Sequence, residues 1–408
     1  MSERSFDVIV VGARCAGSPT AMLLARRGHR VLLVDKATFP SDTMSTHMVH
    51  PPGLAALARW GLLERLAATG CPPVPTYSFD FGPVTISGTP QPIEGIAHGY
   101  CPRRTVLDQL LVEAAGEAGV EVREGFTVEE VVVEDGVVTG IRGHVRGGAT
   151  VTERAPIVVG ADGRHSLVAK AVAPEAYNER PSRMAMYYAY WSDLPTAAFD
   201  TTIRAEDQRG WAAIPTHDDL TVVPFGWPRA EFHANRGDIE GNFMKATELS
   251  PSFAERIRGA TRVSKFVGSA ELPGYFRKPS GPGWALVGDA GYHKNPITAM
   301  GINDAFRDAE LVAEAIDDHL AGRRPFEEGM RAYQEIRDAE AGPVYEFADD
   351  FARLEPPPPE LQQLIGAMAG NQPAMDAFVS VQAATLPAPA FFAPENVGRI
   401  MSEAGAPA

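Results

Sequence analysis

Short apolar runs and one amphipathic segment alternate over the first 35 residues. Residues 6–11 form an apolar run broken only by one aspartate, which predicts a central parallel strand buried on both faces. Residues 18–27 place apolar side chains at helical spacing, and Gly28 follows where the helix ends. Residues 31–34 are again apolar and predict a second strand. The order strand, helix, strand predicts a βαβ unit with parallel strands.

A similar succession returns between residues 284 and 316. Residues 284–287 predict another apolar strand, which ends at Gly288 and Asp289. A loop rich in proline and glycine follows, and a helix begins near Ile302. The apolar face of this helix comprises Ala305, Ala309, Val312, Ala313 and Ile316. Its N-terminal N–H groups point back toward the loop, where they can hold an anion or an electron-rich ring edge.

The middle of the chain follows a different pattern. Residues 183–191, 210–216 and 219–227 are rich in aromatic side chains and alternate in polarity, which predicts antiparallel strands. After Gly342 the pattern is helical, and four consecutive prolines within residues 355–360 end one helix before the next begins.

Composition narrows the class of protein. Of 408 residues, 45% are apolar and 22% charged, as expected for a globular enzyme. The net charge of −15 repels phosphate backbones and anionic lipid, so we expect neither a nucleic-acid nor a membrane-surface partner. Three cysteines without metal-ligand spacing indicate a reducing compartment and no metal site. No signal peptide or apolar run of about 20 residues is present, which predicts a cytoplasmic protein without a membrane span.

The turn after the first strand carries the first candidate chemistry. Gly12 follows the strand at once, and Gly17 stands where the helix must pack closely against it. Asp35 ends the second strand, where a carboxylate can bind a ribose hydroxyl. The middle glycine of the usual nucleotide-binding pattern is replaced by Arg14, whose guanidinium either reaches a phosphate oxygen or stays exposed beside a displaced phosphate. The predicted cofactor contacts of this unit are Gly12, Ala13, Arg14, Ala16, Gly17, Asp35 and Lys36.

Three further motifs stand in a fixed order along the chain. They are "GD" at Gly288 and Asp289 with "GIN" at residues 301–303, "DG" at Asp162, and an arginine that opens a helix at Arg104 or its neighbour Arg103. With the glycine turn, they make the chain resemble the FAD-dependent aromatic hydroxylase superfamily, the group A flavoprotein monooxygenases. The sister branches are geranylgeranyl-reductase-like enzymes and flavin-dependent halogenases, and the resemblance is nearest to the reductase-like branch.

The resemblance implies an FAD site. In that superfamily the "GD" aspartate contacts the flavin ribityl chain, a following proline lines the pocket, and the "GxN" backbone holds the pyrimidine edge. The cofactor residues implied here are Arg104, Asp162, Asp289, Pro296, Gly301, Ile302 and Asn303. The sequence "GDAGYHKNP" departs from the Ala-His of many hydroxylases after "GD", which limits how much catalytic detail can be transferred.

The segment after the second strand should run beneath the flavin. By position, Ser45, Thr46 and His47 lie near the ring, and His47 is the candidate acid/base residue. His50 and His293 are further acid/base candidates. The alternative for His47 and His50 is a loop histidine that binds backbone or caps a helix, and the alternative for His293 is a loop histidine half open to solvent. The substrate candidates on the antiparallel strands are Tyr188, Tyr190, Trp211 and Phe225, of which we expect one or two to line the pocket and the rest to be core.

These elements predict an α/β fold with three parts. Residues 1–71, 99–174 and 275–345 are expected to form a Rossmann-like FAD domain with a parallel sheet. Residues 72–98 and 175–274 should form the antiparallel-sheet substrate domain, and residues 346–408 a C-terminal helical tail. The final helices either cap the pocket or form the contact of a homodimer.

The resemblance implies an FAD-dependent monooxygenase. No second nicotinamide-binding unit is present, which fits a family in which NADPH or NADH binds only transiently to reduce the flavin. Reduced FAD would react with molecular oxygen to give a C4a-(hydro)peroxide, and a small organic substrate, aromatic or a natural product of secondary metabolism, would take one oxygen atom.

Three alternatives remain. One is a reductase or dehydrogenase that acts on C=C bonds of an isoprenoid-like substrate. A halogenase is disfavoured, because its W-x-W-x-I-P motif is matched here by "GWAAIP", with Gly210 and Ala212 at the tryptophan positions, and no counterpart of its chloride-site lysine is evident. The last is a flavin-binding protein without turnover.

Overall fold

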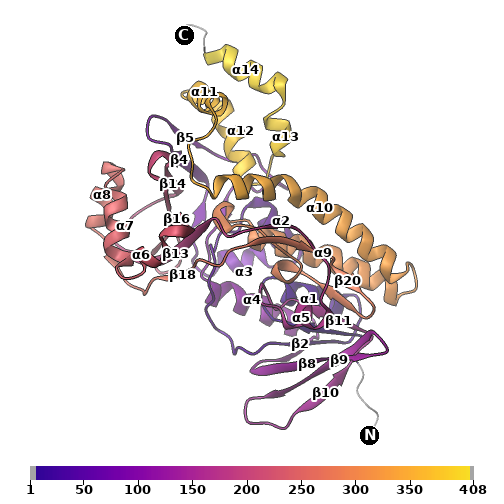
Figure 1. The fold of residues 1–408 in the computed structure, drawn as a ribbon. Coiled ribbons are helices and arrows are strands. Elements are labelled where there is room, and N and C mark those ends of the chain that lie inside the picture. Colours follow the sequence, from indigo (N-terminus) through magenta and orange to yellow (C-terminus); the bar gives the residue numbers. More distant parts are fainter. Residues whose placement is uncertain (1–5, 405–408) are drawn as a thin grey trace.

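A six-stranded sheet, parallel except at one edge, organises one half of the molecule (Figure 1). The computed structural model describes residues 6–404. The strand order is β20 (Ser280–Gly281), β21 (Trp284–Leu286), β11 (Ile157–Gly160), β1 (Val8–Val11), β2 (Val31–Val34) and β7 (Glu121–Arg123). The central strands are continuous apolar runs because both faces of the sheet are covered.

Helices cover one face of this sheet. Their bounds are α1 (Gly17–Arg26), α2 (Pro51–Arg59), α3 (Leu63–Ala67), α4 (Arg104–Glu117) and α9 (Gly301–Leu320). The apolar side of α9 predicted from the sequence packs in the same core cluster as β1 and α1. The bounds of β1, α1, β2 and β21 and the start of α9 agree with the sequence prediction to within two residues, because each has an unambiguous apolar pattern.

A three-stranded antiparallel sheet covers the other face. It consists of β10 (Val151–Arg154), β9 (Val137–Val145) and β8 (Phe126–Glu134), and it packs with α5 (Leu167–Val172) on the cluster that contains Ile9 and Leu32. The glycines of residues 143–148 thus belong to the end of β9 and the turn into β10, and not to a strand-loop-helix unit.

An eight-stranded sheet forms the second half of the molecule. Its strands are β4 (Thr76–Asp80), β5 (Thr85–Gly88), β13 (Met184–Ser192), β14 (Ala198–Arg204), β15 (Arg209–Pro215), β16 (Thr221–Pro228), β17 (Thr261–Arg262) and β18 (Val267–Ser269). All pairs are antiparallel except β14 with β4. The three aromatic-rich segments of the sequence form β13, β15 and β16. Helices α7 (Ile239–Thr247) and α8 (Pro251–Arg258) cover its outer face.

Smaller elements connect the two halves. A two-stranded sheet consists of β3 (Pro73–Val74) and β6 (Gly99–Tyr100). A three-stranded sheet consists of β12 (Ala176–Arg180), β19 (Gly274–Arg277) and β22 (Tyr292–His293). Both lie where the chain passes between the two halves. Helix α6 (Phe232–Asn235) and the 3-10 turns η1 (Ala205–Asp207), η2 (Arg229–Glu231), η3 (Gly288–Ala290) and η4 (Pro296–Thr298) complete them.

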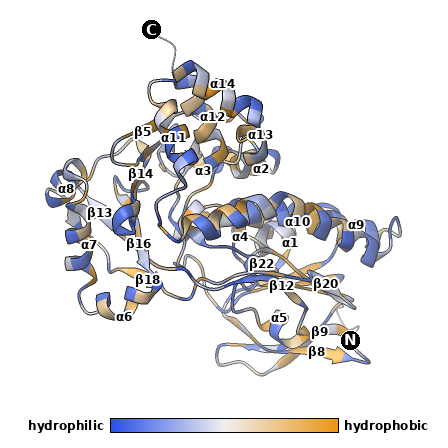
Figure 2. Ribbon diagram, turned by 45° about the horizontal axis from the view of Figure 1, so that its top comes forward, coloured by the Kyte–Doolittle hydropathy of each residue, from blue (hydrophilic) through white to orange (hydrophobic). Residues whose placement is uncertain are grey.

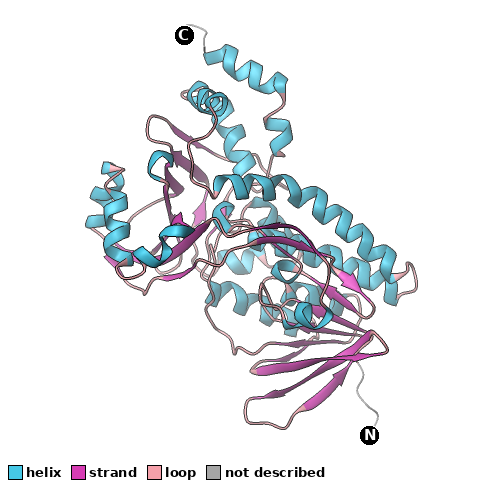
Figure 3. Cartoon of the chain, in the orientation of Figure 1, coloured by secondary structure: helices cyan, strands magenta, loops and turns pink. Residues whose placement is uncertain are grey.

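After β22 the described chain contains only helices (Figure 3). Helix α10 (Phe326–Phe351) runs unbroken through Pro343 and the predicted boundary at residue 345, and hydrophobic and hydrophilic residues alternate along it (Figure 2). The proline run separates it from α11 (Pro359–Met368), as the sequence predicts. Helices α11, α12 (Gln372–Gln382), α13 (Ala388–Phe391) and α14 (Pro394–Ala404) pack on the core cluster at the inner face of the eight-stranded sheet. Over residues 6–404, no helix combines the length and the apolarity that a bilayer crossing demands.

Candidate functional site

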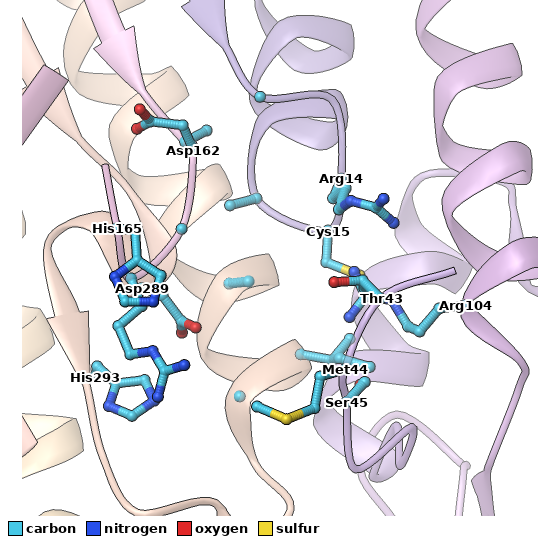
Figure 4. A pocket seen from close by; sticks show the side chains of 18 of the residues that line it. Arg14, Cys15, Thr43, Met44, Ser45, Arg104, Asp162, His165, Asp289 and His293 are labelled. Atoms are coloured by element: carbon cyan, nitrogen blue, oxygen red, sulfur yellow. The ribbon is translucent and has the colours of Figure 1, made fainter. Parts of the chain in front are cut away.

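A cavity of about 960 Å³ opens at the carboxyl ends of β1, β2, β11 and β21. Loops that follow parallel strands meet at this edge of the sheet, which is where α/β proteins bind ligands. Figure 4 shows the labelled side chains on two opposing sides: Asp162, His165, Asp289 and His293 on one, and Arg14, Cys15, Thr43, Met44, Ser45 and Arg104 on the other.

The glycine turn has no room for side chains. Gly12 has φ +104°, and a Cβ added to it would lie 2.5 Å from the Ala161 carbonyl oxygen. A Cβ on Gly17 would lie 1.8 Å from the Gly12 oxygen. The Asp35 carboxylate accepts hydrogen bonds from the N–H groups of Ala13 at 2.7 Å and Ala37 at 2.8 Å. Because a carboxylate can accept further bonds, Asp35 links the two loops and still offers lone pairs to a ligand.

Arg14 is bound within the protein to a neighbouring helix and loop. Its guanidinium donates to the buried Asp108 carboxylate at 2.5 Å and to Ser41 Oγ at 2.7 Å, and its side chain is 24% exposed. Arg104 also binds Asp108 through Nε and Nη2 at 2.9–3.0 Å. Two cations therefore neutralise one buried carboxylate on α4, and Arg14 ties the glycine turn to that helix. Burial raises the pKa of the neighbouring Cys15 thiol well above its usual range.

Unpartnered polar atoms on this cavity fit a dinucleotide such as FAD. Asp162 accepts through Oδ2 from the Leu167 N–H at 2.6 Å, but its Oδ1 has no partner within the protein. Asn295 Nδ2 and Arg164 Nη1 are likewise buried and unpartnered, and both residues line the cavity. Buried polar atoms require partners, and the hydroxyl, amide and phosphate groups of FAD match this mixture of acceptor and donors. These three side chains and Asp289 would hold it.

Most residues predicted to contact the cofactor border this cavity. They are Gly12, Arg14, Ala16, Asp35, Lys36, Ser45, Thr46, Arg104, Asp162, Asp289, Pro296, Gly301 and Ile302. Ala13, Gly17 and Asn303 do not line it. Asn303 Oδ1 instead accepts the His50 N–H at 3.1 Å, while its Nδ2 has no partner. His293, a further acid/base candidate, lies on the cavity wall, and the sequence prediction missed Arg164 and Lys294. Their positions directly beside the "DG" and "GD" motifs were the available signal.

His47 lies on the wall of neither cavity described here. It is fully buried in a left-handed conformation (φ 64°), and its Nε2 lies 2.8 Å from the Tyr190 hydroxyl. Burial, together with Arg104 and Arg103, lowers the pKa of His47 to about 3, so its ring is neutral. Burial also lowers the pKa of His50 to about 4, and its Nδ1 lies 3.0 Å from the Tyr77 hydroxyl.

A second cavity of about 70 Å³ adjoins the first on the inner face of the eight-stranded sheet. The two share the wall residues Thr46, Met186, Pro224 and Pro296. Among the described residues that line the second cavity none is charged, and its sheet side includes Phe79, Phe199, Ile203, Gly210, Ala212 and Ile214. It is an apolar space that meets the cofactor cavity at Pro296.

The four substrate candidates separate by face. Tyr188 lines the large cavity, and Tyr190 packs beside it against His47. Trp211 and Phe225 lie on strands that border the second cavity, but their rings point away from it and pack on the outer face of the sheet. Trp211 lies against Phe253 with ring centroids 5.6 Å apart, and Phe225 lies 4.3 Å from Phe243.

Comparisons with known proteins agree with this architecture. The chain is 26% identical over 330 residues to a 1H-pyrrole-2-carbonyl-[peptidyl-carrier protein] brominase of Pseudoalteromonas luteoviolacea, covering 79% of this chain and 80% of that protein. It is 29% identical over 317 residues to a 6-methylpretetramide 4-monooxygenase of Streptomyces rimosus, covering 74% and 73%. More distant similarity extends to digeranylgeranylglycerophospholipid reductases.

A solved structure shows the same fold. A myxobacterial chondrochloren halogenase superposes with a TM-score of 0.79 at 24% identity, covering 98% of this chain and 96% of that one. The family model described as "FAD binding domain" matches residues 5–348. The chain therefore belongs to the FAD binding domain family and is an FAD-dependent oxidoreductase of the hydroxylase and halogenase group.

Proposed function

We propose that this protein is a monooxygenase that uses NADPH or NADH and molecular oxygen to oxygenate a small, mainly apolar organic substrate. The observation that carries the proposal is the shared wall between the two cavities. A substrate in the second cavity would lie next to the cofactor, at the wall formed by Thr46, Met186, Pro224 and Pro296. This proximity suits transfer of an oxygen atom from the cofactor to the substrate.

The side chains that line the second cavity can position a substrate but cannot act as acids or bases. None of its lining residues titrates near neutral pH, so their contribution is to orient a substrate and exclude water. Bound FAD supplies the redox chemistry that activates oxygen. The residues at its cradle, among them Asp35, Asp162 and Asp289, would fix its position relative to that pocket.

A halogenase is the second candidate, because a brominase is among the relatives. The chloride-site lysine that the halogenase resemblance requires has no counterpart on the second cavity. Lys294, the lysine buried at the cofactor cavity, forms an ion pair with Asp304. Gly210 and Ala212, which stand at the halogenase tryptophan positions, line the second cavity and leave it open beside the cofactor.

A reductase of isoprenoid chains fits less well. A cavity of about 70 Å³ exceeds the roughly 10–15 Å³ needed for one water several times over, but it does not accommodate a long polyprenyl chain. The size favours a compact ring.

Oxygen transfer can be tested directly. The FAD-loaded protein would be given NADPH or NADH, isotopically labelled O₂ and a panel of small phenols, with and without bromide. We expect phenol-stimulated oxidation of the nicotinamide and one labelled oxygen atom in the product, regardless of bromide. A brominated product would identify a halogenase, and a saturated C=C bond without oxygen uptake a reductase. Either outcome would reject the proposal.

A further inference from the structure

Two hydroxyl groups on the second cavity have no hydrogen-bond partner within the protein. They are Thr201 Oγ1 and Thr298 Oγ1, and both atoms are buried. Thr298 is only 7% exposed and ends the η4 turn that begins at Pro296, on the cofactor side of the cavity. Thr201 lies on β14, on the face that also carries Phe199 and Ile203. The two residues therefore border the same apolar space from different elements.

An unpaired buried hydroxyl is costly to a folded protein. Such a group loses its hydrogen bonds to water on folding and gains none in return, and native structures contain few of them. The wall also contains Thr46, Thr202 and Gln382, but none of these side chains forms a hydrogen bond with either hydroxyl. Two unpartnered hydroxyls on one small apolar cavity point to a ligand that carries the missing donor or acceptor.

The outer wall limits the size of that ligand. Leu354 and Phe351 close the cavity from the end of α10, beyond the matched family segment of residues 5–348. Leu354 packs close to the sheet, since a Cβ added at Gly210 would lie 3.4 Å from Leu354 Cδ2. The end of α10 and the residues that follow it thus bound the cavity on this side.

We propose that Thr201 and Thr298 form a recognition pair for a hydroxyl or carbonyl oxygen on a compact, uncharged ring. The inference rests on the proposed function in that it takes the second cavity as the substrate site. An oxygen held by Thr298 places the ring beside Pro296, at the wall shared with the cofactor cavity. A carboxylate is excluded, because none of the described residues on the cavity wall carries a positive charge that would offset the cost of removing the carboxylate from water.

Binding to the FAD-loaded protein tests the pair without requiring turnover. Phenol, toluene and benzoate would be titrated separately, with the change in flavin absorbance as the readout. We expect phenol to bind more tightly than toluene and benzoate not to bind. Thr201→Val and Thr298→Val should each weaken phenol about 3- to 10-fold, the effect of one neutral hydrogen bond, and leave toluene unchanged or tighter. Thr85→Val, at an exposed position of β5, is the matched control and should change neither value.

Melting temperature separates recognition from a structural role. Valine removes a hydroxyl that has no partner, so both variants should melt no lower than the wild type. A lower melting temperature with an unchanged preference for phenol over toluene would overturn the inference, as would tight binding of benzoate or no response to any of the three probes. Threonine-dependent phenol binding without labelled product would reject the proposed oxygenation and leave the recognition pair standing.

Discussion

The two adjoining cavities differ in almost every physical respect. The cofactor cavity is about 960 Å³ and is lined by aspartates, arginines and lysines. The second is about 70 Å³, and none of the described residues on its wall is charged. The first consists mainly of loops after parallel strands, where backbone N–H groups and short polar side chains are exposed. The second consists mainly of strand faces, which present apolar side chains at alternate positions. Loops thus supply specific polar contacts, and sheet faces supply a dry space of limited size.

Blocking the apolar cavity should have the largest effect. Ala212→Trp would fill it from β15, and substrate-stimulated oxidation of NADPH or NADH should fall about 100-fold or more, equivalent to at least about 2.7 kcal/mol. FAD affinity should stay within about 3-fold, because the cradle lies on the other side of the shared wall. Steady-state assays and FAD titration measure the two effects. Ala369→Trp, at an exposed position after α11, is the control. An equal loss of FAD binding would show that the two cavities are not independent.

Weakening the polar cavity should give the complementary result. Asp289 faces the cavity, and within residues 6–404 no hydrogen bond to its carboxylate is present. If the carboxylate binds the flavin ribityl chain, Asp289→Ala should weaken FAD by about 1.5–3 kcal/mol, or roughly 10- to 150-fold. Circular dichroism and melting in excess FAD should be unchanged, and activity should return at saturating FAD. Asp207→Ala, at an exposed site, serves as control. Unfolding in the presence of FAD would make Asp289 a structural residue.

Acid should destabilise the protein through the buried His47 and His50. The folded-state pKa values of His47 and His50 lie at about 3 and 4, below the ordinary value of 6.5, so only the unfolded chain takes up protons as pH falls below that value. The contribution of these two rings to the free energy of unfolding is therefore complete above about pH 6.5. Below that pH it declines by about 1.4 kcal/mol per pH unit for each ring, until the folded-state pKa is reached. Denaturant melts between pH 7.5 and 5 measure this slope. His47→Phe should reduce it and His233→Gln should not. An unchanged slope in His47→Phe would mean that the folded protein protonates His47 normally.

The smallest effect is expected at Arg14. Asp108 keeps Arg104 as its partner in Arg14→Gly, and the lost pair is partly exposed, so FAD affinity should change by less than about 5-fold. The salt dependence of FAD binding should also be unchanged, because Arg14 binds a carboxylate and not a phosphate. FAD titrations at low and high salt provide the measurement. A marked loss of affinity accompanied by weaker salt dependence would show that Arg14 turns to the phosphates when FAD binds.

The local sequence pattern was sufficient to predict most of the elements and residues that form the cofactor cavity. The strands β1, β2 and β21 and the helices α1 and α9 follow from apolar periodicity, and Gly12 and Gly17 from the steric demands of a tight turn. Because the carboxyl ends of parallel strands share one edge, motifs far apart in the sequence could be expected to meet there. Thirteen of the sixteen predicted cofactor residues (all but Ala13, Gly17 and Asn303) do line the cavity at that edge.

The second cavity and the environment of Arg14 depended on tertiary structure. The alternation of side chains along a strand places Trp211 and Phe225 on the opposite face of the sheet from Gly210 and Ala212. It does not predict which of the two faces lies toward the cofactor. The bond between Arg14 and Asp108 joins residues 94 positions apart, and Leu354 reaches the cavity from the end of α10. The sequence by itself determined the local elements and the turn chemistry, because these depend on neighbouring residues. Only the packed chain decided which side chains share a cavity, because that depends on contacts between residues that no local pattern relates.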